Sequence, residues 1–340
     1  MEPTMLQILW FILIFVLIIG YFVLDGFDLG IGVMYPFLAK DEKEKAVLRR
    51  AIGPVWDGNE VWLLTAGGAL FAAFPAAYAT TFSGFYLAIM LVLFGLIIRA
   101  VSIEFRGHDK AHGSMWDALF FVGSLLPALL FGVAIGNVLQ GIPLNVQGDY
   151  TGSFFGLLGL FPLVCGLLGL AQFINQGLSW TAVKVQPGAL YDRAVSMRRI
   201  AQIAVLVLFV LASILFLAQT ATLTGGILSV LRIVFAIVIV LAVVVAFFFA
   251  SKDADFASFI ASSVICVGLV GLTAASLYPL IVPCPDLGLS ISIMSAASSE
   301  LALTCMTVIT AIGLPLVLIY HVLVYRTFRG KVKDEDLGDY

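Results

Sequence analysis

The sequence predicts an all-α polytopic membrane protein, and two observations lead to that prediction. Of the 340 residues, 61% are hydrophobic and only 11% are charged, and the mean hydropathy is +1.09. A soluble surface of ordinary size carries more charge than this. The chain also contains repeated apolar runs of about 20 residues, which is enough to cross about 30 Å of hydrocarbon as a helix. Runs of this length are too long for the strands of a membrane barrel.

Hydropathy over windows of about 19 residues predicts nine transmembrane helices. They are expected near residues 7–35, 54–74, 78–103, 117–139, 154–178, 200–222, 227–250, 256–281 and 301–325. The segments between them reach only about 20 residues, so residues 1–340 are expected to form a single integral membrane domain. The first apolar run is too long for the core of a cleavable signal peptide, and we expect it to stay as a helix.

The basic residues occur in alternate loops, which predicts the orientation. Only Arg99 and Arg232 of the 18 lysines and arginines fall inside predicted spans. The loops near 140–153, 223–226 and 282–300 contain no lysine or arginine. By the positive-inside rule, the N-terminus is expected outside and the C-terminus in the cytoplasm. The net charge of −3 is too small to indicate a nucleic-acid partner.

Four carboxylates are expected at the cytoplasmic end of the first two spans. Asp25 and Asp28 lie near the end of the first span, while Asp57 and Glu60 lie at the start of the second. Each pair is spaced i,i+3, which places its members on neighbouring positions of a helix surface. A carboxylate inside a membrane helix costs about 2.5–3.5 kcal/mol, so four together predict a function. We interpret them as a hydrophilic inlet for protons or other cations.

A structural explanation stays open for some of these acids. Asp57, Glu60 and Asp117 stand near the starts of their helices, where a carboxylate stabilises free N–H groups and the helix dipole. Asp25 and Asp28 lie near a helix C-terminus, where a negative charge is unfavourable. Glycines 26, 30 and 32 beside them predict a close helix contact or a break.

The remaining polar residues indicate no cofactor bound by this chain alone. Asn59 is expected to hydrogen-bond a neighbouring carboxylate, and Trp56 to serve packing or the interfacial aromatic belt. Of three histidines, His108 and His112 lie in a loop and only His321 lies in a span. A bis-histidine haem site needs two facing histidines. The cysteines have no metal-binding spacing and are expected to be apolar helix residues: Cys165, Cys266, Cys284 and Cys305.

Several blocks of sequence resemble subunit II of the cytochrome bd-type quinol oxidases. They are GFDLGIG at 26–32, GPVWDGNEVWLLTAGGALFAAFPAAYATTFSGFY at 53–86, RAVSIEFR at 99–106, MWDALFFVGSLLPALLFGVAIGNVLQGIP at 115–143 and SSELALTCM at 298–306. The resemblance covers nearly the whole chain. It implies nine helices arranged as two four-helix bundles plus one peripheral helix, in a bacterial or archaeal cytoplasmic membrane.

The resemblance also implies partners and cofactors. In this family the subunit forms a heterodimer with subunit I, which carries two b-type haems, one d-type haem and the quinol site. A small single-helix subunit occurs in some complexes, and some subunits II hold a structural quinone. The complex oxidises quinol, reduces dioxygen to water and takes up cytoplasmic protons. Carried onto this chain, the aspartate of the WDGN motif is Asp57, with Asp25 and Asp28 as neighbours and Glu60 where some relatives have glutamine.

The leading hypothesis is therefore a non-haem oxidase subunit that supports subunit I and supplies part of a cytoplasmic proton inlet. The inlet would consist of Asp57, Asp25, Asp28 and Glu60, supported by Trp56, Asn59 and Asp117. The alternatives are an ion-coupled secondary transporter, whose sites usually lie nearer the membrane midplane, and a purely structural partner subunit.

Overall fold

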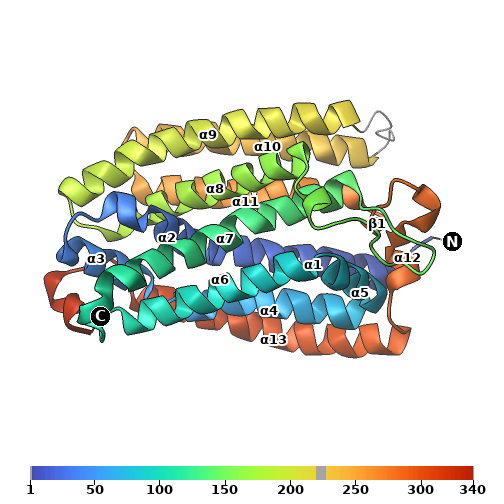
Figure 1. Cartoon of the computed structure of the whole chain (residues 1–340), viewed down its shortest axis with the longest axis horizontal. Helices are drawn as coiled ribbons and strands as arrows, with labels where there is room; N and C mark the ends of the chain where they lie inside the picture. The colour runs from blue at the N-terminus through green and yellow to red at the C-terminus, as the bar shows by residue number, and fades with distance from the viewer. Residues whose placement is uncertain (1, 220–226, 340) are drawn as a thin grey trace.

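The computed structural model describes residues 2–219 and 227–339. Most of the chain forms long helices that run along one axis of the molecule (Figure 1). The first half contains α1 (Met5–Leu24), α2 (Gly26–Leu38), α3 (Glu42–Ile52), α4 (Trp56–Ala73), α5 (Pro75–Gly84), α6 (Tyr86–Phe105) and α7 (Gly113–Gln140). The second half contains α8 (Leu160–Lys184), α9 (Ala189–Gln219), α10 (Ile227–Ala250), α11 (Asp255–Leu277), α12 (Ile293–Ala296) and α13 (Glu300–Thr327). A short antiparallel pair, β1 (Leu280–Val282) with β2 (Ile291–Ser292), precedes α12.

Eight helical segments in the described ranges are long and apolar enough to cross a membrane. The first of them, Met5–Leu38, combines α1 and α2, and the others contain α6, α7, α8, α9, α10, α11 and α13. Helix α4 is not among the eight, because the polar residues Asp57, Asn59 and Glu60 lie near its start. It nevertheless lies alongside the other long helices (Figure 1). The helical membrane fold class is confirmed, while the number nine stays a prediction.

The two ends of the helix bundle differ in charge. One end contains α3, the α6–α7 and α8–α9 connections and the segment that follows α13, and we call it the basic end (Figure 1). The other end contains the N-terminus, α5, β1 and α12 (Figure 1). The loops with the predicted lysines and arginines all lie at the basic end.

Four predicted spans differ from the helices observed. The span at 154–178 lies about six residues too early, because Phe155–Leu157 is a short 3-10 turn and α8 runs from Leu160 to Lys184. The span at 7–35 is broken at Asp25, which ends α1 and precedes α2. The span at 78–103 is two helices, because α5 begins at Pro75, a residue favoured in the first turn, and ends before Phe85. The span at 200–222 begins earlier, at Ala189, because hydropathy undervalues the charged first turns of α9. Residues 220–222 lie outside the described residues.

The long helices form two groups of four, with α13 at the periphery. Helices α1/α2, α4, α6 and α7 form the first group, and α8 to α11 form the second. The groups meet along α8, against which both α2 and α7 pack. Almost no side chain separates α2 from α8, since a Cβ on Gly30 would lie 1.8 Å from the carbonyl oxygen of Phe173. This confirms both the close contact and the break predicted from the glycines of GFDLGIG.

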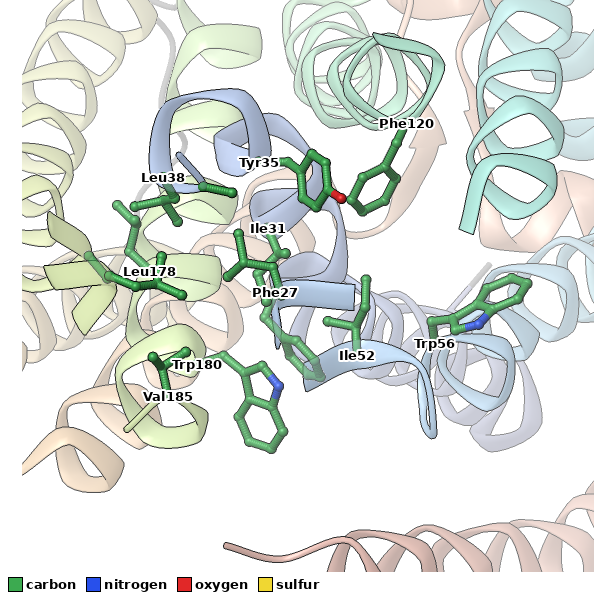
Figure 2. Close-up of a cluster of buried hydrophobic side chains, with 14 of the residues drawn as sticks. Phe27, Ile31, Tyr35, Leu38, Ile52, Trp56, Phe120, Leu178, Trp180 and Val185 are labelled. Atoms are coloured by element: carbon green, nitrogen blue, oxygen red, sulfur yellow. The ribbon is translucent and has the colours of Figure 1, made fainter. Parts of the chain in front are cut away.

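A hydrophobic core fills the basic end between the two groups (Figure 2). Phe27 of α2 stacks against Trp180 of α8 with ring centroids 4.6 Å apart, and Tyr35 meets Phe120 of α7 edge to face. Trp56 at the start of α4 is buried in the same cluster. Of the two roles left open for Trp56, packing and the interfacial belt, the structure shows packing, and the core fixes the start of α4 beside the break in the first span.

Candidate functional site

The break between α1 and α2 places two aspartates in the interior. Asp25 and Asp28 both have 0% exposure. Asp25 continues the helical hydrogen-bond pattern with its own N–H, which donates to Tyr21 O at 2.8 Å. The carboxylates of both residues point into a space bounded by α4 and α6, where buried polar partners meet them.

Asp25 is held by a buried arginine from α6. Arg99, also at 0% exposure, donates from Nη1 to Asp25 Oδ2 at 3.0 Å and from Nη2 to Asp25 Oδ1 at 2.8 Å. This two-pronged geometry is the strongest form of carboxylate–guanidinium contact. Glu60 of α4 approaches the same guanidinium, with its Oε1 2.9 Å from Nη2. A buried charge of this kind is tolerated only because it is paired.

Asp28 is held by neutral partners instead. Asn59 of α4 donates from Nδ2 to Asp28 Oδ2 at 2.8 Å and to the carbonyl oxygen of Leu24 at 3.1 Å. The hydroxyl of Tyr325, near the end of α13, donates to Asn59 Oδ1 at 3.0 Å. Within the described residues, Asp28 Oδ1 and Glu60 Oε1 are buried without a hydrogen-bond partner, but Glu60 Oε1 has the ion-pair contact with Arg99, which Asp28 Oδ1 lacks.

These residues form what we call the carboxylate cluster: Asp25, Asp28, Asn59, Glu60, Arg99 and Tyr325. Three carboxylates face one guanidinium in it. Full ionisation would leave two negative charges unbalanced in a buried space, which is costly in a low-dielectric interior. The arrangement can lower that cost by holding a proton, and Asp28 Oδ1 is the oxygen left open for one.

Asp57 lies outside this cluster. Helix α4 buries Asn59, Trp62 and Ala66 against the bundle. Because successive helix positions turn by about 100°, Asp57 is about 200° around the helix from Asn59. It is exposed, at the head of a stripe of other exposed residues on α4 that runs towards the opposite end: Val61, Leu64, Gly68 and Phe71. The predicted i,i+3 spacing keeps Asp57 close enough to Glu60 for their charges to interact, although no hydrogen bond or ion pair joins Asp57 to the cluster among the described residues.

Asp117 belongs to a surface ion-pair network at the basic end. Its Oδ1 lies 2.7 Å from Arg106 Nε, and its Oδ2 lies 2.8 Å from Lys45 Nζ. Glu42 of α3 contacts the same two cations at 2.6 and 2.9 Å. The hydrogen bond with Asp117 raises the pKa of Arg106, and the hydrogen bond with Lys45 lowers the pKa of Glu42. Asp117 thus ties α7 to α3 and α6 and does not enter the carboxylate cluster.

A second buried polar network joins α8 to α11, and sequence reasoning missed it. Gln172 donates to Ser262 O at 2.7 Å and accepts from Asn175 at 3.2 Å. Gln176 donates to Val23 O at 3.3 Å and accepts from the Cys266 thiol at 3.3 Å. We call this the amide network. Its signal in the sequence was the run of amides in QFINQ at 172–176, inside an apolar span.

An apolar cavity of about 470 Å³ lies among α7 to α11, beside the amide network. Gln172 and Cys266 form part of its wall, and Arg232 of α10 contributes another polar group. Arg232 Nε donates to Ala275 O at 3.2 Å, and its buried Nη1 has no partner among the described residues. The cavity therefore suits a largely apolar molecule with a hydrogen-bond acceptor.

The residues of this chain do not fit a haem iron. Both ring nitrogens of His321 are used: Nδ1 lies 2.9 Å from Val317 O, and Nε2 accepts from Trp62 Nε1 at 3.2 Å. His108 and His112 are exposed in the α6–α7 connection. In the described ranges, no three His, Cys, Asp or Glu residues gather as a metal site would require.

The fold and site together define a class: a helical membrane subunit with a buried carboxylate cluster and an apolar cavity. A family model for cytochrome bd terminal oxidase subunit II matches residues 6–328, and the chain belongs to that family. Like its relatives, it is therefore a subunit of an oxidoreductase complex.

Curated relatives agree with this assignment. The chain is 36% identical to a probable cytochrome oxidase subunit 2 from Haemophilus influenzae, over 96% of this chain and 95% of that one. It is 33% identical to the cytochrome bd-I ubiquinol oxidase subunit 2 of Escherichia coli K12, over 99% and 97%. It is 34% identical to the cytochrome bd ubiquinol oxidase subunit 2 of Bacillus subtilis, over 96% and 97%.

A solved structure shares the fold. The bd oxidase from Geobacillus thermodenitrificans matches with a TM-score of 0.78 at 16% identity, covering 96% of this chain and 99% of that one. At that identity the likeness supports the fold alone.

Proposed function

We propose that this chain is the non-haem subunit II of a membrane quinol:oxygen oxidoreductase, and that it provides part of the proton inlet. The oxidation of two quinols supplies the four electrons that reduce one dioxygen to two waters. The four protons that this reduction consumes have to come from one side of the membrane. The observation that carries the proposal is the carboxylate cluster, in which two fully buried carboxylates and a partly exposed one, Glu60, lie around one buried guanidinium.

The inlet is proposed to open at the basic end. By the positive-inside rule this end faces the cytoplasm, with the N-terminus outside. Glu60 lies in the second turn of α4, which starts towards the basic end, and Asp28 contacts Asn59 beside it, so both lie in the half of the bundle towards this end. Asp28 would take up a proton on Oδ1, while Arg99 holds Asp25 and Glu60 in place. The Arg99–Asp25 pair is thereby a positioning element, and Asp28 is the proton carrier.

Asp57 is proposed to act at the interface with subunit I. The exposed face of α4 carries Asp57, Thr65 and Gly68 among apolar residues. A carboxylate facing lipid is costly, and small residues favour close helix packing, so this face suits a protein partner. The neighbouring helix α13 is also largely exposed. Subunit I covering this surface would bring Asp57 between the two chains.

The redox groups are proposed to belong to subunit I. The two b-type haems and the d-type haem would be bound there, because His321 is occupied by its own contacts. Quinol is the proposed substrate of the complex, as the printed names of the relatives from Escherichia coli and Bacillus subtilis say of those proteins. A structural quinone in this chain would fit the 470 Å³ cavity, with Arg232 Nη1 donating to a ring oxygen.

The direct test is Asp28→Asn in the whole complex. The substitution keeps an acceptor for Asn59 but removes the site for a proton. We expect haem content, read from the absorption spectrum, to stay normal, while quinol-driven oxygen uptake per haem falls at least about tenfold. Asp286→Asn, the same change at an exposed site of the opposite end, is the control.

Two outcomes would contradict the proposal. Normal oxygen uptake per haem in Asp28→Asn would remove Asp28 from the inlet. A loss of haem in proportion to uptake would favour the purely structural subunit. The family assignment does not favour the transporter alternative.

A further inference from the structure

The peripheral helix α13 touches the rest of the molecule at few points. Only Leu303 and His321 of its 28 residues are buried. Towards the opposite end, Trp10 of α1 donates to Leu303 O at 3.1 Å and to Thr307 Oγ1 at 3.0 Å. Towards the basic end, the helix is fixed by two hydrogen bonds, one from Trp62 to His321 and one from Tyr325 to Asn59. One of these anchors therefore ends inside the carboxylate cluster.

The contacts of Asn59 leave a single position for the Tyr325 hydroxyl. Asn59 uses both hydrogens of its Nδ2, on Asp28 Oδ2 and on Leu24 O. Its Oδ1 is then the atom that accepts, and the hydroxyl of Tyr325 meets it at 3.0 Å. A flipped amide would turn its oxygen towards two acceptors and its N–H groups towards the hydroxyl. Tyr325 thus fixes which way the amide of Asn59 faces.

The orientation of Asn59 decides which oxygen of Asp28 is open to a proton. Asp28 Oδ2 accepts from Asn59, so a proton on that oxygen would weaken the hydrogen bond from the amide. Asp28 Oδ1 is buried and has no partner among the described residues. The ionisable groups that act on Asp28 include Asp25, Arg99, Glu60 and Tyr325, and none of them forms a hydrogen bond with Oδ1. Asn59 therefore determines which oxygen of Asp28 is open to a proton, and Tyr325 determines which way the amide of Asn59 faces.

We propose that Tyr325 is a positioning residue for proton transfer: through Asn59 it holds Asp28 with Oδ1 open to receive a proton. The inference rests on the proposed proton function of Asp28. It adds a role for α13, which brings the tyrosine hydroxyl to the cluster from the edge of the bundle. Release of the basic half of α13 would free the Asn59 amide and disorder the proton site without moving any carboxylate-bearing helix.

The test compares Tyr325→Phe with Tyr320→Phe in the purified complex. Tyr320 lies on the same helix and is 50% exposed, and a Cβ on Gly58 of α4 would lie 3.0 Å from its hydroxyl. We expect Tyr325→Phe to keep its haem content and to lose about fivefold in oxygen uptake per haem, the equivalent of one neutral hydrogen bond. The midpoint of the pH profile of uptake should move by about half a unit or more. Tyr320→Phe should change neither quantity.

A second pair of variants tests the route through Asn59. Asn59→Ala alone should lose at least as much uptake per haem as Tyr325→Phe, and the double variant should lose no more than Asn59→Ala. If the loss of uptake in the double variant is the sum of the losses in the two single variants, Tyr325 acts independently of Asn59 and the inference is overturned.

The remaining outcomes separate this inference from the proposed function. If Tyr325→Phe keeps wild-type uptake per haem and pH profile while Asp28→Asn is inactive, the inference fails and the inlet stands. If both variants keep wild-type uptake, the inlet itself fails. If uptake in Tyr325→Phe falls only in proportion to haem content, the tyrosine is an anchor of α13 and the positioning role is refuted.

Discussion

The carboxylate cluster and the amide network are both buried, but they are built from different chemistry. The cluster joins the α1–α2 break, α4 and α6 through three carboxylates and one guanidinium. The amide network joins α8 and α11 through Gln172, Gln176 and Cys266, which are all neutral. Neutral side-chain hydrogen bonds between membrane helices contribute about 0.6–2 kcal/mol each. The amide network thus holds helices together with neutral groups, whereas the carboxylate cluster contains groups whose proton number can change.

The largest effect should come from removing the only cation of the cluster. Arg99→Met would leave Asp25 and Glu60 buried and unpaired, which costs about 3–5 kcal/mol. We expect the yield of assembled complex and its midpoint of thermal unfolding to fall sharply. Arg329→Met, at an exposed arginine after α13, is the matched control. An Arg99→Met complex as stable as this control would mean that the cluster is not electrostatically balanced by Arg99.

A smaller effect is expected in the amide network. Gln176→Leu removes contacts with Val23 O, Ser263 Oγ and Cys266 Sγ, at a cost of about 1–2 kcal/mol. The thermal midpoint should fall while oxygen uptake per haem stays at the wild-type value. Gln176→Glu, which adds a charge at nearly the same volume, should destabilise the complex more than Gln176→Leu does. A change in oxygen uptake per haem in Gln176→Leu would contradict the expectation that the amide network, unlike the carboxylate cluster, affects stability alone.

Asp57→Asn should leave stability almost unchanged, because the side chain is exposed in this chain. We expect a change in unfolding free energy below about 0.5 kcal/mol and normal haem content. Oxygen uptake per haem should nevertheless fall severalfold, because the carboxylate is proposed to serve the inlet from the interface with subunit I. Wild-type uptake would show that the inlet bypasses Asp57, and the cluster alone would then define the route within this chain.

The smallest effect should come from the surface network around Asp117. The hydrogen bond with Lys45 lowers the pKa of Glu42 in the folded protein. The stabilisation that ionised Glu42 contributes to the folded protein is therefore present above the ordinary pKa of a glutamate. It is lost as the pH falls through the lowered pKa of Glu42. Glu42→Gln should cost about 0.5 kcal/mol or less near neutral pH, because the side chain is largely exposed. The difference from wild type should vanish in acid, and thermal unfolding across pH would check this.

Sequence reasoning predicted the helices and part of the cluster for clear physical reasons. Apolar runs indicated where most of the long helices lie, and the positions of Asp25, Asp28 and Glu60 towards the same end of their spans were enough to place them near each other. Asn59 was correctly expected to bind a carboxylate.

The remaining contacts depend on which way each helix turns. Spacing alone could not show that α4 buries Asn59 and Trp62, which leaves Asp57 on the other side. Arg99 looked like an isolated charge, because its partners lie on other helices. Tyr325 is 266 positions from Asn59 in the chain, and no local pattern links them. Such contacts follow from tertiary packing, which hydropathy does not describe.

The break at Asp25 has one more consequence. Two consecutive peptide carbonyls just before it face opposite halves of the molecule: Val23 O accepts from Gln176 of α8, and Leu24 O accepts from Asn59 of α4. A small rotation of these two peptide groups would lengthen the hydrogen bond on one side of α1 and strain the hydrogen bond on the other side. These two peptide groups therefore link the positions of α4 and α8 through the backbone of α1.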